Sequence, residues 1–202
     1  MFVKNVEDIS GGRYKVTMDD DVSFVLYKGE ISKFRIAVDT DIDDTRYEQI
    51  MHKILPRRAR LRLLNLLARR PYTEHQLKVK LIDGGYPESI ADDAISYVSG
   101  MHLIDDYGYC RDYIFHSSAT KSRKRIVSDL LKKGVPACVI ESAMSSIEDD
   151  GDLAEEDSLI YRLMEKRSYN KDTATYEEKQ KMLRFLYGRG FACEAIDRCM
   201  KS

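Results

Sequence analysis

The chain has 202 residues, of which 43% are hydrophobic and 33% are charged, and its formal net charge is −1. This near-neutral balance argues against a protein that binds nucleic acid through an overall positive charge. No apolar run approaches the roughly 18 residues that a membrane span needs, and residues 1–10 lack the basic and apolar regions of a secretory signal. We therefore expect a cytoplasmic protein, whose four cysteines are reduced core thiols rather than disulfide partners or metal ligands.

The first 55 residues differ in pattern from the rest of the chain. Residues 14–18 alternate apolar and polar side chains, apolar residues recur at alternate positions in Val22, Phe24 and Leu26, and a turn of three aspartates separates the two segments. This pattern is typical of a β-hairpin. Residues 2–6 have a similar character, and we expect them to add a third strand.

The segment that follows the hairpin is less uniform. Residues 30–38 leave helix and strand open as alternatives. Asp43 or Asp44 can cap a helix that runs through Ile54. Pro56 would then either end this helix or start the next one.

After Pro56 one pattern occurs three times: a leucine, a glycine four residues later, and then an apolar residue. The glycines are Gly85, Gly134 and Gly190, which lie 49 and 56 residues apart. A glycine that ends a helix adopts the left-handed conformation without a Cβ clash, and the next apolar residue commonly packs back onto the helix. We predict a positive φ at all three glycines. Self-similarity at such a period is typical of stacked supersecondary units.

The spacing of apolar residues around each glycine turn predicts three helices per unit. The predicted helices cover residues 57–70, 73–83 and 87–99, then 106–117, 122–133 and 136–147, and finally 154–167, 175–188 and 192–201. Thr73 with Gln76, and Thr175 with Glu178, have the spacing of capping boxes.

The predicted fold is therefore mainly α. It is a tandem array of three three-helix repeats, at residues 56–104, 105–150 and 151–202, and a small extension containing the β-hairpin (residues 1–55) precedes them. The acidic run at residues 148–152 is expected to be a solvated hinge.

The sequence shows no arrangement typical of catalytic or metal-binding side chains. The four histidines are scattered, without an HExxH motif or a cysteine at ligand spacing. Asp105 and Asp106 could form an acid pair, but at the predicted start of a helix they are better explained as capping residues. A phosphate-binding glycine loop and a nucleophile elbow are both missing. We expect no catalytic activity, no metal and no cofactor.

Two stretches of the chain are strongly basic. The first contains Arg57, Arg58, Arg60, Arg62, Arg69 and Arg70, and the second contains Lys121, Arg123, Lys124, Arg125, Lys132 and Lys133. In both cases the alternatives are the solvated face of an amphipathic helix and a contact with an acidic protein surface or a phosphate backbone. The second stretch begins at the N-terminal end of its helix, where positive charge opposes the helix dipole, which favours a functional use. All of these residues except Arg62 form the candidate partner-binding set.

Short motifs occur along the chain in a fixed order. They are Arg70, Thr73-Glu74, Leu77, Leu81 and Gly85, then residues 103–106, Tyr113-Ile114, Ile126, Leu130 and residues 133–135, and finally residues 184–186, residues 189–191 and Ile196. In this ordered set the sequence resembles the RecX regulatory proteins of bacterial recombination, over essentially its whole length.

The resemblance implies a curved array of three three-helix repeats that lies in the helical groove of the RecA filament on single-stranded DNA. There it would restrain the recombinase and coprotease activities of RecA, in homologous recombination, DNA repair and the SOS response. It implies no catalysis. We further expect a monomer, with at most weak direct contact to DNA and no membrane contact.

Two other functions remain open at this point. One is a helical DNA- or RNA-binding protein, because a helix, a glycine turn and a second helix resemble a helix-turn-helix. The neutral charge and the threefold tandem arrangement argue against this alternative. The other is a scaffold for an unrelated protein partner.

Overall fold

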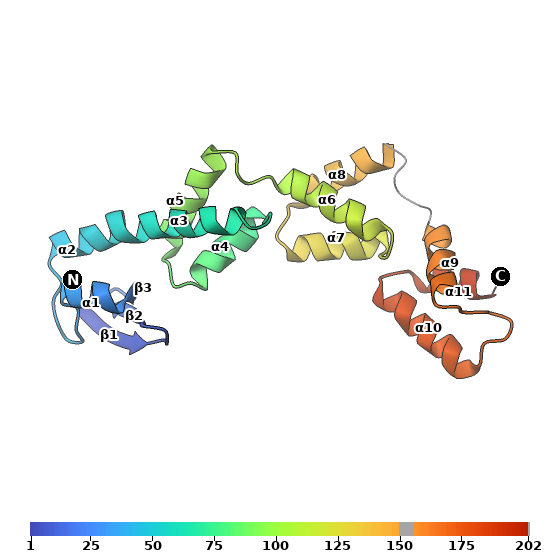
Figure 1. The fold of residues 1–202 in the computed structure, drawn as a ribbon, viewed down its shortest axis with the longest axis horizontal. Coiled ribbons are helices and arrows are strands. Elements are labelled where there is room, and N and C mark those ends of the chain that lie inside the picture. Colours follow the sequence, from blue (N-terminus) through green and yellow to red (C-terminus); the bar gives the residue numbers. More distant parts are fainter. Residues whose placement is uncertain (150–155, 202) are drawn as a thin grey trace. The chain divides into compact units, whose positions relative to one another are not determined.

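The computed structural model describes residues 1–149 and 156–201 (Figure 1). The chain divides into two compact units, Met1–Asp105 and Asp106–Ser202. It is mostly helical, with a small three-stranded antiparallel sheet near its N-terminus, as predicted. The finer boundaries expected at residues 55, 104 and 150 remain predictions.

The sheet confirms the predicted hairpin and its third strand. Its strands are β1 (Val3–Asp8), β2 (Arg13–Met18) and β3 (Ser23–Tyr27), paired in sequence order. Val16 lies opposite Phe24 on the neighbouring strand, and both side chains are fully buried, so one face of the sheet belongs to the core. Helix α1 (Lys28–Phe34) follows directly and packs beside β3, so most of the ambiguous segment is helical.

A continuous helical segment leads from the sheet into the first repeat. It consists of α2 (Asp44–Gln49), the π-helical turn η1 (Ile50–Ile54) and α3 (Leu55–Leu67). Asp43 caps this segment, since its carboxylate accepts a hydrogen bond from the Arg46 N–H at 2.9 Å. Pro56 lies in the first turn of α3, where its missing N–H is best tolerated. The second of the two alternatives for Pro56 is therefore correct, and the π turn precedes it without a break in the helix.

The first repeat consists of α3, α4 (Glu74–Ile82) and α5 (Glu88–Gly100). Thr73 and Gln76 form the predicted capping box, with reciprocal backbone-to-side-chain hydrogen bonds of 3.2 and 3.3 Å. The apolar faces of the sheet and of these helices meet in one hydrophobic core, which includes Phe24, Leu63 and Leu81. The N-terminal extension and the first repeat therefore share a core.

The second unit contains six helices within the described residues. They are α6 (Asp106–Ser118), α7 (Arg123–Lys132), α8 (Ala137–Asp149), α9 (Glu156–Lys166), α10 (Tyr176–Gly188) and α11 (Cys193–Lys201). The first three enclose one apolar cluster and the last three another. The predicted start of a helix at Ala154, and most of the expected hinge, lie outside the described residues.

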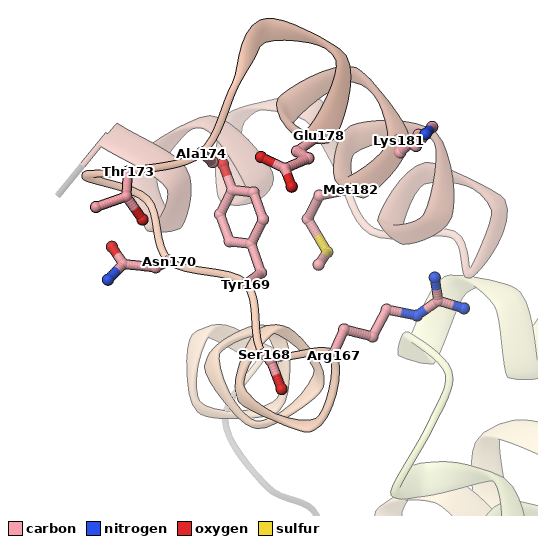
Figure 2. A pocket seen from close by; sticks show the side chains of 9 residues that line it. All are labelled: Arg167, Ser168, Tyr169, Asn170, Thr173, Ala174, Glu178, Lys181 and Met182. Carbon is pink, nitrogen blue, oxygen red and sulfur yellow. The ribbon is translucent and has the colours of Figure 1, made fainter.

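The connection between α9 and α10 borders a pocket of about 280 Å³ (Figure 2). Arg167 and Tyr169 line it from the connection, and Glu178 and Lys181 line it from α10. The predicted capping box is present here, because the Thr175 hydroxyl accepts the Glu178 N–H at 3.3 Å and the Glu178 carboxylate accepts the Thr175 N–H at 2.8 Å.

The three glycine turns have the same geometry. The φ angles of Gly85, Gly134 and Gly190 are 79°, 78° and 88°, as predicted. In each turn the residue after the glycine donates its N–H to the carbonyl of the leucine five residues earlier, at 3.2 Å to Leu81, 3.2 Å to Leu130 and 3.5 Å to Leu186. This is the hydrogen bond of a Schellman cap. The repeat register taken from the sequence is therefore confirmed.

The prediction for the cysteines is half wrong. All four are free, as expected, and Cys110 and Cys199 are buried. Cys138 and Cys193, however, are exposed. Both lie in the first turn of a helix, on the side away from the apolar cluster, so the apolar character of the residue did not decide its position.

Candidate partner-binding surface

The arginines of the first basic stretch do not share one face. Arg58 points into the first unit, where its guanidinium donates to the Val25 carbonyl and to the Glu30 carboxylate, the latter at 2.8 Å. The same group lies over the rings of Tyr27 and Tyr86, 4.8 and 5.4 Å from their centroids. Arg58 therefore fastens the sheet to the first repeat, a structural role that the run of arginines did not reveal.

Arg57 and Arg60 border a groove between α3 and α5. Arg60 forms an ion pair with Asp93 at 2.7 Å and lies over the Tyr97 ring, 4.6 Å from its centroid. Arg57 is exposed and forms no ion pair with the part of the chain that the structure describes. Leu61, which follows Arg60 and lies one helical turn after Arg57 on α3, is 50% exposed.

We call this feature the α3–α5 groove. It has a volume of about 290 Å³, and its lining residues are His52, Lys53, Pro56, Arg57, Arg60, Leu61, Leu64 and Tyr97. A second cavity of about 340 Å³ shares His52, Pro56 and Arg60 with it. Apolar side chains with a basic rim are typical of protein docking surfaces, in which aromatic residues and arginines are enriched.

Arg69 and Arg70 lie beyond the end of α3, away from the groove residues at its start. Arg70 stacks on Tyr72, with its guanidinium carbon 4.1 Å from the ring centroid, and Lys80 approaches the same ring at 5.4 Å. Arg69 is exposed. The predicted set in the first unit is thus divided into an inward residue, a groove pair and a separate pair at the helix end.

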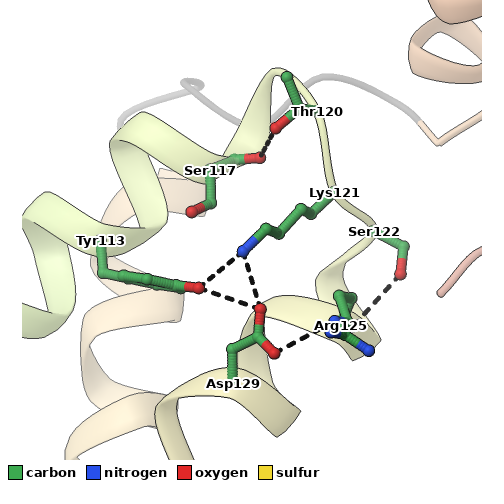
Figure 3. Close-up of polar contacts among 7 residues, drawn as sticks. All are labelled: Tyr113, Ser117, Thr120, Lys121, Ser122, Arg125 and Asp129. Carbon is green, nitrogen blue, oxygen red and sulfur yellow. Dashed lines mark hydrogen bonds and ion pairs between the residues drawn. The ribbon is translucent and has the colours of Figure 1, made fainter. Parts of the chain in front are cut away.

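The second basic stretch contains an internal ion-pair network (Figure 3). The Lys121 ammonium donates to the Asp129 carboxylate at 2.8 Å and to the Tyr113 hydroxyl at 2.7 Å. The Tyr113 hydroxyl donates to the same carboxylate at 3.0 Å, and Arg125 pairs with it at 3.1 Å. Asp129, one turn after Arg125 in α7, therefore compensates the positive charge that seemed unfavourable at the start of the helix.

The network shifts the pKa values of both partners. Burial raises the pKa of Asp129, but the hydrogen bonds from Lys121 and Tyr113 outweigh burial, and the pKa lies below its ordinary value of 3.8. Burial likewise lowers the pKa of Lys121, and its hydrogen bonds reverse this and raise the pKa above 10.5. Both groups are therefore charged at neutral pH.

The other basic residues of this stretch have different surroundings. Lys124 and Lys132 are exposed near the two ends of α7. Lys133 approaches the rings of Tyr109 and Tyr113, at 5.9 and 5.3 Å from their centroids. Arg123 is exposed but has a contact within the protein. Lys124 and Lys132 are thus the members of this stretch most available to a partner.

Sequence reasoning missed one basic feature, in the third repeat. The guanidinium carbons of Arg167 and Arg189 each lie 3.7 Å from the centroid of the Phe185 ring. We call these three residues the Phe185 clamp. Phe185 and Arg189 belong to motifs on which the resemblance rests, but Arg167 is far from them in sequence, so no local pattern could indicate the contact.

The described residues contain neither a cluster typical of a metal centre nor a helix that could span a membrane. Residues 1–149 and 156–201 contain no group of three or more His, Cys, Asp or Glu side chains that could hold a metal ion. Among the helices of those residues, none combines the length and the apolar character required to cross a bilayer. The features that remain are exposed basic and aromatic surfaces.

Comparison with known proteins identifies the repeats. Residues 59–97 match the first three-helix domain of RecX, and residues 155–200 match its third three-helix domain. The chain is 26% identical to the regulatory protein RecX of Caldanaerobacter subterraneus over 189 residues, which are 93% of this chain and 92% of that protein. It is 28% identical to the regulatory protein RecX of Leuconostoc mesenteroides over 190 residues, 92% of this chain and 69% of that protein.

Solved structures agree on the fold. A crystal structure of regulatory protein RecX aligns with a TM-score of 0.59 at 22% identity, covering 100% of this chain and 99% of that one. A crystal structure of RecX from Lactobacillus salivarius aligns with a TM-score of 0.54 at 22% identity, covering 73% of this chain and 95% of that one. Together with the repeated glycine turns, the domain matches place the sequence: the chain belongs to the RecX family of regulatory proteins.

Proposed function

We propose that the protein is a non-catalytic regulator of the RecA recombinase, which binds the RecA filament on single-stranded DNA and restrains its recombinase and coprotease activities. It would act as a cytoplasmic monomer, in homologous recombination, DNA repair and the SOS response. Its membership of the RecX family supports this proposal, as does the regulatory role that the names of its relatives state.

The observation that carries the proposal is the α3–α5 groove. Leu61 and Tyr97, which are 50% and 44% exposed, give it an apolar floor, and Arg57 adds a positive charge with no ion-pair partner in the described chain. Such a surface suits a protein partner with an acidic rim, because charges at the rim accelerate association and exposed aromatic and apolar groups supply contact area.

A repeat array that contacts neighbouring RecA protomers should bind the RecA filament more tightly than an isolated RecA protomer, because linked contacts increase the effective concentration of each site. The experiment compares three surfaces in biolayer interferometry: RecA filaments on single-stranded DNA, RecA without DNA, and the same DNA without RecA. We expect binding to the filament to exceed the other two at least tenfold, with parallel inhibition of strand exchange. Equal, strongly salt-dependent binding to naked DNA would contradict the proposal and favour the nucleic-acid-binding alternative.

A groove variant tests whether this surface takes part. Arg57→Gln with Leu61→Ser removes one charge and one exposed apolar side chain, and it leaves the buried core unchanged. The matched control is Lys15→Gln with Val38→Ser, which makes the same changes at exposed positions of the N-terminal extension. We expect the groove variant to bind filaments about tenfold more weakly, whereas the control should keep the wild-type affinity.

A further inference from the structure

The Phe185 clamp has a geometry that fixes the spacing of two positive charges. A guanidinium at 3.7 Å from a ring centroid covers one face of the ring, so Arg167 and Arg189 must occupy opposite faces of Phe185. Their guanidinium carbons are then separated by about twice this distance, or roughly 7 Å. Phe185 itself is half-buried and packs against the apolar cluster of the third repeat, which holds the ring in place.

The two charges of the clamp are not compensated inside the protein. Neither Arg167 nor Arg189 forms an ion pair with a carboxylate of the described residues. By contrast, the part-buried cations Arg58 and Lys121 each have an acidic partner at 2.8 Å. Burial, and after it the charge of Arg167, lower the pKa of Arg189. Two positive charges this close repel each other, and an anion bound near both would compensate the repulsion.

The nearest pocket does not supply that anion. Arg167 and Glu178 both line it (Figure 2). The Glu178 carboxylate, however, already accepts hydrogen bonds from the Thr175 N–H and hydroxyl, at 2.8 and 3.0 Å. These bonds lower the pKa of Glu178 and hold it in the capping box. The N–H groups of the two guanidiniums are therefore available to an external oxyanion.

The spacing fits the side chains of an extended peptide. In a β-strand, residues i and i+2 point to the same side and lie about 6.6–6.8 Å apart, close to the separation of the two guanidiniums. Each arginine can accept one carboxylate in the bidentate geometry that guanidinium groups favour. We propose that the Phe185 clamp binds two alternate carboxylates, in the pattern acid–x–acid, of an extended acidic segment on the protein partner.

Two observations favour a peptide over a nucleic acid strand at this site. Single-stranded DNA binds largely by stacking its bases on free aromatic faces, and both faces of Phe185 are covered. In addition, residues 151–202 contain ten basic and ten acidic residues, so the repeat provides no net positive field for a polyanion. The identity of the partner as a RecA filament rests on the proposed function, whereas the carboxylate pattern does not.

The first experiment uses the full chain and two end-blocked peptides of equal charge. One contains Glu-Ala-Glu, which places both carboxylates on one side of an extended strand, and the other contains Glu-Glu-Ala, which does not. Binding is followed through the Nε–Hε NMR resonances of Arg167 and Arg189. We expect the alternating peptide to bind about tenfold more tightly and to shift both resonances. Equal binding of the two peptides, or shifts at neither arginine, would overturn the proposal.

Variants separate the clamp from general charge. Arg167→Gln leaves the core intact, because Arg167 is exposed, and Arg189→Lys keeps the charge but removes the fork of donors. Each should abolish the preference for the alternating peptide. The control Arg162→Gln removes an exposed charge elsewhere in the third repeat and should leave the preference unchanged.

Two further arms assign the partner. The first arm uses a fifteen-residue oligothymidylate as the probe. If Arg167→Gln weakens binding of this oligonucleotide but leaves peptide binding unaffected, the ligand is phosphate and the peptide proposal is refuted. Filament binding that falls at least about fivefold in Arg167→Gln, but not in the control, would support the clamp in its proposed context. If the wild type binds the alternating peptide but not RecA filaments, the proposed function fails while the clamp stands. If the wild type shows no preference for the alternating peptide and filament binding is normal in Arg167→Gln, the clamp fails while the function stands.

Discussion

Val25 donates its backbone N–H to the carbonyl of Gly85 over 3.0 Å, so the middle of the outer strand β3 is hydrogen-bonded to the turn between α4 and α5. The contact is close, because a Cβ at Gly85 would overlap the side chain of Val25. Glycine at position 85 therefore serves two purposes. Its positive φ reverses the chain after α4, and its lack of a side chain leaves room for the strand.

Gly85→Ala should destabilise the first unit by at least about 1–2 kcal/mol, because a left-handed alanine is strained and its methyl group meets Val25. The matched control is Gly100→Ala at the end of α5, where an added Cβ meets nothing within 4 Å. That change should be neutral or stabilise by up to about 1 kcal/mol. Urea titrations of the three proteins provide the measurement, and equal midpoints for both variants would contradict the role of the turn.

Two adjacent leucines of α7 allow a test of the repeat core. Leu130 is fully buried, whereas Leu131 is 50% exposed. Leu130→Ala should lower the free energy of unfolding by about 2–5 kcal/mol, as for a buried leucine that leaves a cavity. Leu131→Ala should change it by less than about 0.5–1 kcal/mol. A loss below about 1 kcal/mol at Leu130 would show that the second repeat does not depend on it.

Asp129 gives the second unit a dependence on pH. Its pKa is lower in the folded protein than its ordinary value of 3.8, so the network stabilises the protein fully above that pH and loses this contribution as the pH falls below it. Asp129→Asn should cost about 1–3 kcal/mol at pH 7. The difference from the wild type should shrink in acid, as measured by urea unfolding between pH 7 and pH 2. Asp112→Asn, at an exposed position of α6, is the control, and a pH-independent cost at Asp129 would contradict this explanation.

In the second repeat, the exposed residues Lys124 and Lys132 are better probes of partner binding than Lys121 and Arg125. Removal of Lys121 or Arg125 would take one cationic partner away from Asp129, so weaker binding could arise from lower stability. Lys124→Ser with Lys132→Ser avoids this problem. The double variant should associate more slowly with RecA–DNA filaments and dissociate at a similar rate, because rim charges mainly steer encounter.

The control for this pair is Lys15→Ser with Lys28→Ser, at exposed positions of the extension. Stopped-flow association at two salt concentrations is the measurement. If the two lysines instead contacted bare phosphate, the salt slope of binding to single-stranded DNA would fall by about 1.4, or 0.7 for each contact. A slope change of that size, with an unchanged association rate for filaments, would contradict the prediction.

The repeated turns and the capping boxes could be predicted because each depends on residues within one helical turn of one another. The Leu–Gly pairs and Thr73 with Gln76 have this character. Local steric and hydrogen-bonding rules decide such features before any helix packs against another. Their positions in the structure therefore agree with the sequence almost residue for residue.

The surface roles could not be predicted in the same way. Arg57 and Arg58 are adjacent and chemically identical, yet a rotation of about 100° per residue along the helix turns one toward solvent and the other toward Glu30. Which of the two arginines faces inward depends on where the sheet packs against α3, and the sequence of α3 alone does not indicate this position. Arg167 and Phe185 meet for a similar reason, since their contact requires the fold of the whole third repeat.

The helical segment from α2 through α3 affects how the protein can be divided. The match to the first three-helix domain begins at residue 59, within α3. Ile50 and Leu55, on the preceding turns, are fully buried in the core that the sheet shares with the repeat. A fragment excised at residue 59 would therefore expose the apolar surface that the sheet and these turns now cover, and would tend to aggregate. Dissection of the chain should therefore keep residues 1–105 together as one folding unit.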